Sequence, residues 1–153
     1  MKTLCSILLL VTCTLYANGQ EEMSQTKMLR LVNEARQKGR YCGPTWYKAA
    51  PPLKWNDKLE QAAKEHCKDM SDKDHLSHTG SSGKKVDERI YDQRYFWRAC
   101  GENVAYGLLY EEEVMKEWLK SPGHCANIMN PAYAEMGAWK TGLYWTQVFA
   151  KGQ

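Results

Sequence analysis

Three residues that could share one chemical site are spread over the second half of the chain. His78 lies in the sequence LSHTG, Glu102 in GEN and His124 in SPGH. Imidazole and carboxylate groups bind zinc, and a catalytic zinc site normally has three protein ligands. A histidine beside a glutamate could also work as an acid–base pair. The alternative without chemistry is a hydrogen-bonded polar cluster, in which Asn103 and Gln147 satisfy backbone groups. The sequence identifies no cofactor beyond a candidate divalent metal, zinc.

Serine hydroxyls near these residues allow a second kind of chemistry. Ser77 or Ser121, together with His78 and Glu102, could form a hydrolase of the Ser/His/Glu type. However, the chain has no G-x-S-x-G nucleophile elbow. Ser121 followed by proline is also typical of a helix N-cap. A hydrolase, metal-dependent or serine-based, is therefore an alternative to the main interpretation.

Short helices must position these residues. The spacing of apolar residues predicts helices over 24–38, from Asn56 or Asp57 to about Met70, over 86–97, over 111–120, and a short one from Ser121. His66 falls on the apolar face of the second of these helices. We therefore expect His66 to be a hydrogen-bonded core residue.

The remaining segments predict a hairpin and loops. Alternating apolar residues predict an antiparallel hairpin with strands 136–140 and 143–150 around Thr141-Gly142. Segments 41–52 and 71–86 are rich in glycine, proline or polar residues and are expected to lack regular structure. Helices combined with few strands indicate an α+β fold, an α-β-α sandwich.

The first 19 residues have the pattern of a secretory signal peptide. Lys2 precedes an apolar run from Leu4 to Leu15, and Ala17-Asn18-Gly19 is a small-x-small cleavage site. The run is too short to span a bilayer, and no later run of about 18 apolar residues occurs, so no membrane span is expected. The mature chain would be one secreted, extracellular domain of residues 20–153.

Export also guides the interpretation of the cysteines. The mature part keeps an even number of them, which indicates disulfides: Cys42, Cys67, Cys100 and Cys125. Four cysteines allow three pairings, and spacing does not choose among them. The net charge of +3 is too small to indicate binding to nucleic acid or to an anionic membrane.

Four motifs occur in an order that resembles the CAP superfamily of cysteine-rich secretory, antigen 5 and pathogenesis-related 1 proteins. They are LSHTG at 76–80, GEN at 101–103, Trp118 with SPGH at 121–124, and YWTQVF at 144–149. The chain resembles the short CAP domains of secreted bacterial proteins over residues 24–151. The resemblance implies an α-β-α sandwich of the CAP type.

The resemblance carries over half of the family's cavity of two histidines and two glutamates. His78 and Glu102 match, whereas Ser121 stands at the second glutamate position and Tyr144 at the second histidine position. His124 lies close to the missing glutamate and could replace it. The residues expected to support the cavity are Asn103, Ser121, Tyr144 and Gln147.

The resemblance also implies a pairing and a function. Similar short forms often carry Cys42 and Cys125 together without the other two, which implies the bridges Cys42–Cys125 and Cys67–Cys100. It implies a secreted binding module, of a defence or venom type, without established catalysis. Some members bind sterols or fatty acids in apolar grooves, which the six Trp and nine Tyr would suit. We expect a monomer whose partner is an extracellular protein or a lipid.

Overall fold

The centre of the protein is a four-stranded sheet in which strands β5 and β6 lie in the middle. The computed structural model describes residues 22–153, so the predicted signal segment 1–19 lies outside the described residues. In the spatial order β3-β5-β6-β4, the strands are Lys54–Trp55, Glu135–Thr141, Tyr144–Gly152 and Trp97–Tyr106. β5 and β6 form the predicted hairpin, and Gly142 in its turn has a φ of +59°, which glycine adopts without strain.

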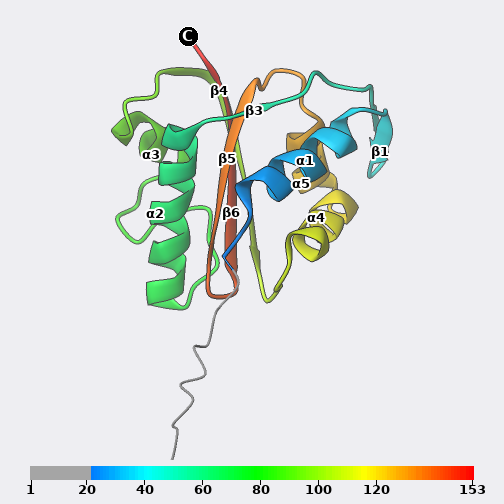
Figure 1. Ribbon diagram of the computed structural model, residues 1–153. Coiled ribbons are helices and arrows are strands. Elements are labelled where there is room, and N and C mark those ends of the chain that lie inside the picture. The colour runs from blue at the N-terminus through cyan, green and yellow to red at the C-terminus, as the bar shows by residue number, and fades with distance from the viewer. Residues whose placement is uncertain (1–21) are drawn as a thin grey trace, which may run out of the picture.

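Helices cover both faces of this sheet (Figure 1). One face carries α2 (Asp57–Lys73) and α3 (Val86–Asp92), and the other carries α1 (Gln25–Arg36), α4 (Glu111–Lys120) and α5 (Pro122–Met129). The predicted α+β fold, an α-β-α sandwich with a C-terminal antiparallel hairpin, is confirmed. No helix within residues 22–153 is long and apolar enough to cross a membrane.

Alternation along the strands decides which residues reach which helical layer. Val148 of β6 belongs to the core that contains Leu59 of α2, whereas the next residue, Phe149, belongs to the core that contains Trp118 of α4. β5 approaches α2 so closely that a Cβ on Gly137 would lie 2.1 Å from a backbone nitrogen of that helix. The sheet therefore separates the core beneath α1, α4 and α5 from two apolar clusters beneath α2. The position of a residue along β4 determines on which side of the sheet its side chain lies.

A two-stranded hairpin lies beside α5, in a segment that was expected to be an irregular loop. β1 (Arg40–Cys42) pairs antiparallel with β2 (Thr45–Tyr47). Gly43, with a φ of +61°, and Pro44 form the turn between the two strands. The predicted disulfide between Cys42 and Cys125 is confirmed, and it fastens this hairpin to α5.

The second predicted disulfide, Cys67–Cys100, is wrong, because both thiols are free. Cys67 Sγ lies 3.0 Å from the backbone oxygen of Tyr144, at the start of β6. Cys100 lies opposite Ala150, near the end of that strand. Residues 144 and 150 are about 20 Å apart along a strand. A disulfide requires Cα atoms within about 7 Å of each other, so the fold keeps these two cysteines apart.

The third helix is shorter than its apolar spacing predicted. α3 ends at Asp92 instead of Trp97, because Arg94 has a φ of +56°, which a right-handed helix does not continue. The chain then enters β4, so the GEN motif lies inside a strand of 10 residues. That placement gives Glu102 and Asn103 opposite directions.

Candidate functional site

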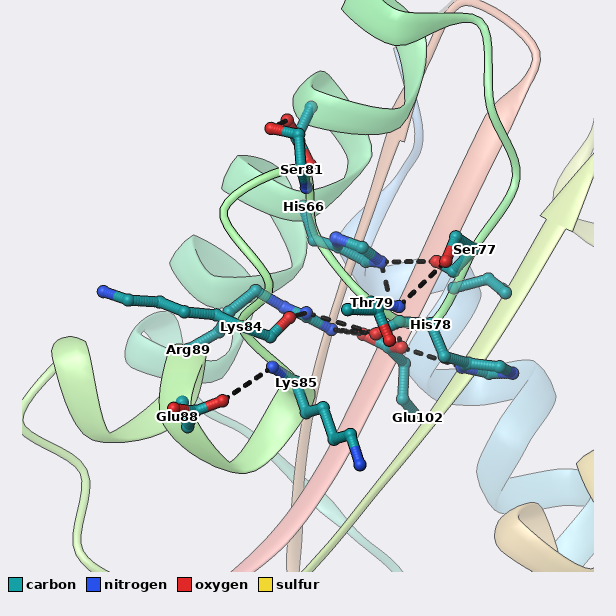
Figure 2. A network of polar contacts seen from close by, with 12 residues as sticks. His66, Ser77, His78, Thr79, Ser81, Lys84, Lys85, Glu88, Arg89 and Glu102 are labelled. Atoms are coloured by element: carbon teal, nitrogen blue, oxygen red, sulfur yellow. Dashed lines mark hydrogen bonds and ion pairs between the residues drawn. The ribbon is translucent and has the colours of Figure 1, made fainter.

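Glu102 is the centre of a polar network on the face of the sheet that α2 and α3 cover (Figure 2). The residue is 5% exposed, and both of its carboxylate oxygens have partners. The Nδ1–H of His78 donates to Oε1 at 2.9 Å, and Nη2 of Arg89 donates to Oε2 at 2.5 Å. The opposite charges of Glu102 and Arg89 compensate each other, as burial requires. Glu102 therefore forms a buried ion pair with Arg89, and neither of its carboxylate oxygens lacks a hydrogen-bond partner.

Arg89 links this carboxylate to the loop between α2 and α3. Its Nη1 donates to the carbonyl oxygen of Lys84 at 2.7 Å, and both Nη atoms lie 3.3 Å from the carbonyl oxygen of His78. One guanidinium thus holds the loop backbone at two points. No sequence motif contains Arg89. Arginine on a short charged helix is normally exposed, so the sequence offered no reason to expect it in a buried network. Its burial follows from packing against β4.

His66 of α2 is the other member of the network that the motifs did not indicate. Its side chain is fully buried, as the helix spacing predicted, and its Nε2 lies 2.8 Å from the carbonyl oxygen of Ser77. Because a carbonyl only accepts hydrogen bonds, Nε2 carries the proton. Burial lowers the pKa of His66, so the ring is neutral at pH 7. Nε2 also lies 3.9 Å from Oε1 of Glu102. His66 therefore joins the loop to the centre of the network.

His78 is the member of the network that reaches solvent. Its side chain is 59% exposed, and its hydrogen bond to Glu102 raises its pKa above the ordinary value. Nδ1 is used by Glu102, so Nε2 is the atom through which His78 could act on a ligand. This geometry is that of a histidine oriented by a carboxylate.

Glu102→Gln is expected to lower the pKa of His78 toward about 6.5, because the Glu102 hydrogen bond is the main cause of the rise. A raised pKa means that the contact stabilises the fold fully below about pH 6.5 and that this stabilisation is lost as the pH rises through the raised value. NMR titration of the His78 ring protons measures the shift. Glu88→Gln, an exposed position on α3, is the control and should leave the titration unchanged. Identical titrations for wild type and Glu102→Gln would contradict the contact.

The next residue along β4 belongs to a separate cluster on the other face of the sheet. Asn103 donates to Oε1 of Gln147 at 3.1 Å and to the carbonyl oxygen of His124 at 3.2 Å. Asn103 Oδ1 accepts from Asn127 at 2.9 Å. Asn103 and Gln147 are fully buried. These amides fasten α5 to the sheet and support the fold at this point.

The three expected zinc ligands are not assembled. His124 is half-buried on α5, and its pKa is lowered by burial and, to a smaller degree, by the charge of His78. Glu102 points to the opposite face of the sheet, and Arg89 occupies its Oε2. Within the described part of the chain, no group of three or more His, Cys, Asp or Glu side chains is placed to hold a metal ion.

Within residues 22–153, two of the residues expected to support the cavity, Ser121 and Tyr144, form no hydrogen bond with Glu102. Ser121 is the N-cap of α5 and makes no capping hydrogen bond with its side chain. Tyr144 lies four residues along β6 from Val148, the partner of Glu102, which places it about 13 Å away along the strand. Its hydroxyl donates to Asp74 at 2.7 Å. Tyr144 therefore contacts the C-terminal end of α2, where Asp74 is the C-cap residue.

Comparison with known proteins identifies the family. The family model of CAP, the cysteine-rich secretory protein family, matches residues 29–148. The chain belongs to this family. The motif order that carried the resemblance therefore identified it correctly, and the CAP domain includes nearly all of the described residues.

Known relatives of this CAP domain include bacterial proteins. Uncharacterized protein YkwD of Bacillus subtilis is 30% identical over 127 residues, which cover 82% of this chain and 46% of YkwD. An extracellular protein containing a SCP domain from Bacillus anthracis has a TM-score of 0.72 at 23% identity, over 83% of this chain and 40% of that one. An outer surface protein from Borrelia burgdorferi has a TM-score of 0.67 at 20% identity, over 84% of this chain and 89% of that one. The chain spans less than half the length of the first two proteins.

Proposed function

We propose that this CAP domain is exported and acts outside the cell as a binding module without catalysis of its own, with its ligand in the groove between α1 and α4. The groove, of about 400 Å³, is the observation that carries the proposal. Its apolar lining comes from successive turns of both helices, Leu31 and Ala35 of α1 and Met115 and Leu119 of α4. The groove is open to solvent, and its apolar residues can contact one side of the acyl chain of a lipid.

The charged residues of the groove favour an anionic ligand. Arg40 and Lys116 line it, and Nε of Arg40 is buried without a hydrogen-bond partner among residues 22–153. Leaving a buried donor unpaired costs about 1–3 kcal/mol, and a carboxylate would supply the acceptor. Glu34 and Glu112 also line the groove, but each pairs with a cation of α1. A long-chain fatty acid therefore fits better than an uncharged sterol.

Three observations support export. Residues 1–19 have the pattern of a signal peptide. The Cys42–Cys125 disulfide is typical of proteins that fold in an oxidising compartment. The structurally similar protein from Bacillus anthracis is described as extracellular. N-terminal sequencing of protein collected from the culture medium should find Gln20 as the first residue.

Leu31→Glu is expected to reduce the amount of fatty acid that copurifies with the protein at least tenfold. The new carboxylate would place a charge in the apolar lining and repel the ligand's own carboxylate. Mass spectrometry of lipid extracts from purified protein measures the ligand without assuming its class. Leu76→Glu, at an exposed leucine outside the groove, is the matched control and should retain the ligand. Equal lipid in both variants, or none in the wild type, would contradict the groove as the site.

A hydrolase is the second candidate, and the His78–Glu102 pair is the observation in its favour. Ser77 is a poor nucleophile for it, because its Oγ accepts a hydrogen bond from the backbone N–H of Thr79 at 3.0 Å. Glu102 is also paired with Arg89, which favours a role for Glu102 in positioning His78 and the loop over a role in catalysis. Cleavage of a broad peptide library that disappears in Glu102→Gln, while that variant remains folded, would support the hydrolase.

A further inference from the structure

The β1–β2 hairpin presents two aromatic side chains to solvent. Tyr41 and Trp46 lie directly opposite each other in the strand register, and they are 67% and 54% exposed. Their rings form an edge contact with 4.9 Å between centroids. Side chains alternate along a strand, and Cys42 faces inward to its disulfide, so its neighbour Tyr41 must face outward. Trp46, opposite Tyr41, shares that outward face.

The hairpin holds this aromatic pair in a fixed position. Gly39 lies against the indole of Trp46, since a Cβ on Gly39 would be 2.6 Å from Cζ2 of that ring. The turn lies against α5, where a Cβ on Gly43 would be 2.9 Å from Cγ of Pro122. The Cys42–Cys125 disulfide adds a covalent link to the same helix. A surface ordered in this way loses little conformational entropy on binding.

The chain around the hairpin is cationic. From Ala35 to Asn56 the sequence contains five Lys and Arg residues and no Asp or Glu. Lys38 precedes β1 and Lys48 follows β2, and both are exposed. Neither forms an ion pair within the part of the chain that the structure describes. The small net charge of the whole chain conceals this local concentration of positive charge.

We propose that the β1–β2 hairpin docks onto an anionic lipid surface. Trp and Tyr are the side chains that prefer the interface between lipid headgroups and acyl chains, where one end is apolar and the other wet. Lysines beside them are attracted to anionic headgroups, and each contributes about fivefold to affinity. Tyr41 and Trp46 enter the interface, and Lys38 and Lys48 contact the headgroups. Docking uses Tyr41, Trp46 and the two lysines, none of which lines the α1–α4 groove, although Arg40 at the start of β1 does line it.

Cosedimentation with vesicles tests this docking. The protein is used from Gln20 onward, because the apolar run of the predicted signal peptide would itself bind lipid, and residues 22–153 contain every element of the sandwich. We expect binding to vesicles of phosphatidylcholine with phosphatidylglycerol, little binding to phosphatidylcholine alone, and a decrease with added salt. Tyr41→Ser with Trp46→Ser should weaken binding at least tenfold. Lys38→Gln with Lys48→Gln should weaken it about 25-fold.

The chain offers a matched control for the aromatic pair. Tyr91 and Phe96 are also exposed, at 61% and 55%, and their rings also make an edge contact, at 5.6 Å. Tyr91→Ser with Phe96→Ser should leave lipid binding unchanged. Equal binding by both aromatic double variants, or no binding by the wild type, would overturn the proposal. So would a dimer that dissociates in Tyr41→Ser with Trp46→Ser while lipid binding persists, because the hairpin would then be a self-association surface.

Discussion

Glu102→Ala is expected to lower the free energy of unfolding by about 3–5 kcal/mol, the usual cost of removing one partner of a buried ion pair. The change leaves the guanidinium of Arg89, whose side chain is 7% exposed, without its carboxylate. It also removes the acceptor of His78 Nδ1. The loop between α2 and α3 would lose the anchor that both residues share. Urea denaturation followed by circular dichroism measures the difference.

An exposed ion pair of similar length is the control for this effect. Glu34 accepts from Arg30 at 2.6 Å on the surface of α1, and Glu34→Ala should cost about 1 kcal/mol or less. The double variant Glu102→Leu with Arg89→Met should lose much less free energy of unfolding than the two single variants lose together. The reason is that the double variant leaves no unpaired buried charge. Additive losses would show that Glu102 and Arg89 do not form a coupled buried pair.

Replacing both Cys42 and Cys125 by alanine is expected to cost about 4–5 kcal/mol on the chain-entropy estimate. The bridge closes a large loop, because its cysteines are separated by 83 residues in the sequence. Without it the unfolded chain gains conformational freedom, and the β1–β2 hairpin loses its link to α5. Urea denaturation of the double variant under non-reducing conditions gives the value.

The free cysteines provide the comparison for the bridge. Cys100→Ala should change the stability by about 1 kcal/mol or less, because the Cys100 thiol is not bonded to another sulfur. Thiol alkylation of the unfolded, unreduced domain from Gln20 onward should label Cys67 and Cys100. If neither residue is labelled, a second bridge joins Cys67 and Cys100, and the two cysteines lie close together.

Much of the fold could be predicted from local patterns. The helices of residues 25–36 and 57–73 have apolar faces and N-cap residues that mark their positions, and the helix of residues 111–120 has an apolar face and an acidic first turn. The β5–β6 hairpin has an alternating pattern around Gly142. Segment 40–47 was not recognised as a hairpin, because its turn consists of Gly43 and Pro44, which also occur in irregular loops. Arg94 ended α3 early through a backbone conformation that arginine seldom adopts.

The candidate site was predicted only in part, because its geometry depends on the sheet. His78 and Glu102 were identified from their motifs, and they form a hydrogen bond. Arg89 was missed, since the sequence does not show that a charged helix packs against β4. His124 was grouped with Glu102 because the motifs suggested one cavity. Residues 102 and 103 point to opposite faces, and it is Asn103 that bonds to the backbone of His124 on α5.

We infer that the ligand is bound between α1 and α4, while the network around Glu102 organises the loop. The most direct test is NMR chemical-shift mapping of the domain during titration with a long-chain fatty acid. We expect the largest backbone amide shifts at the apolar residues of the groove, Leu31, Ala35, Met115 and Leu119. The amides of His78 and Glu102 should remain unchanged. Shifts centred on His78 and Glu102, with none in the groove, would show that the ligand binds at the Glu102 network instead.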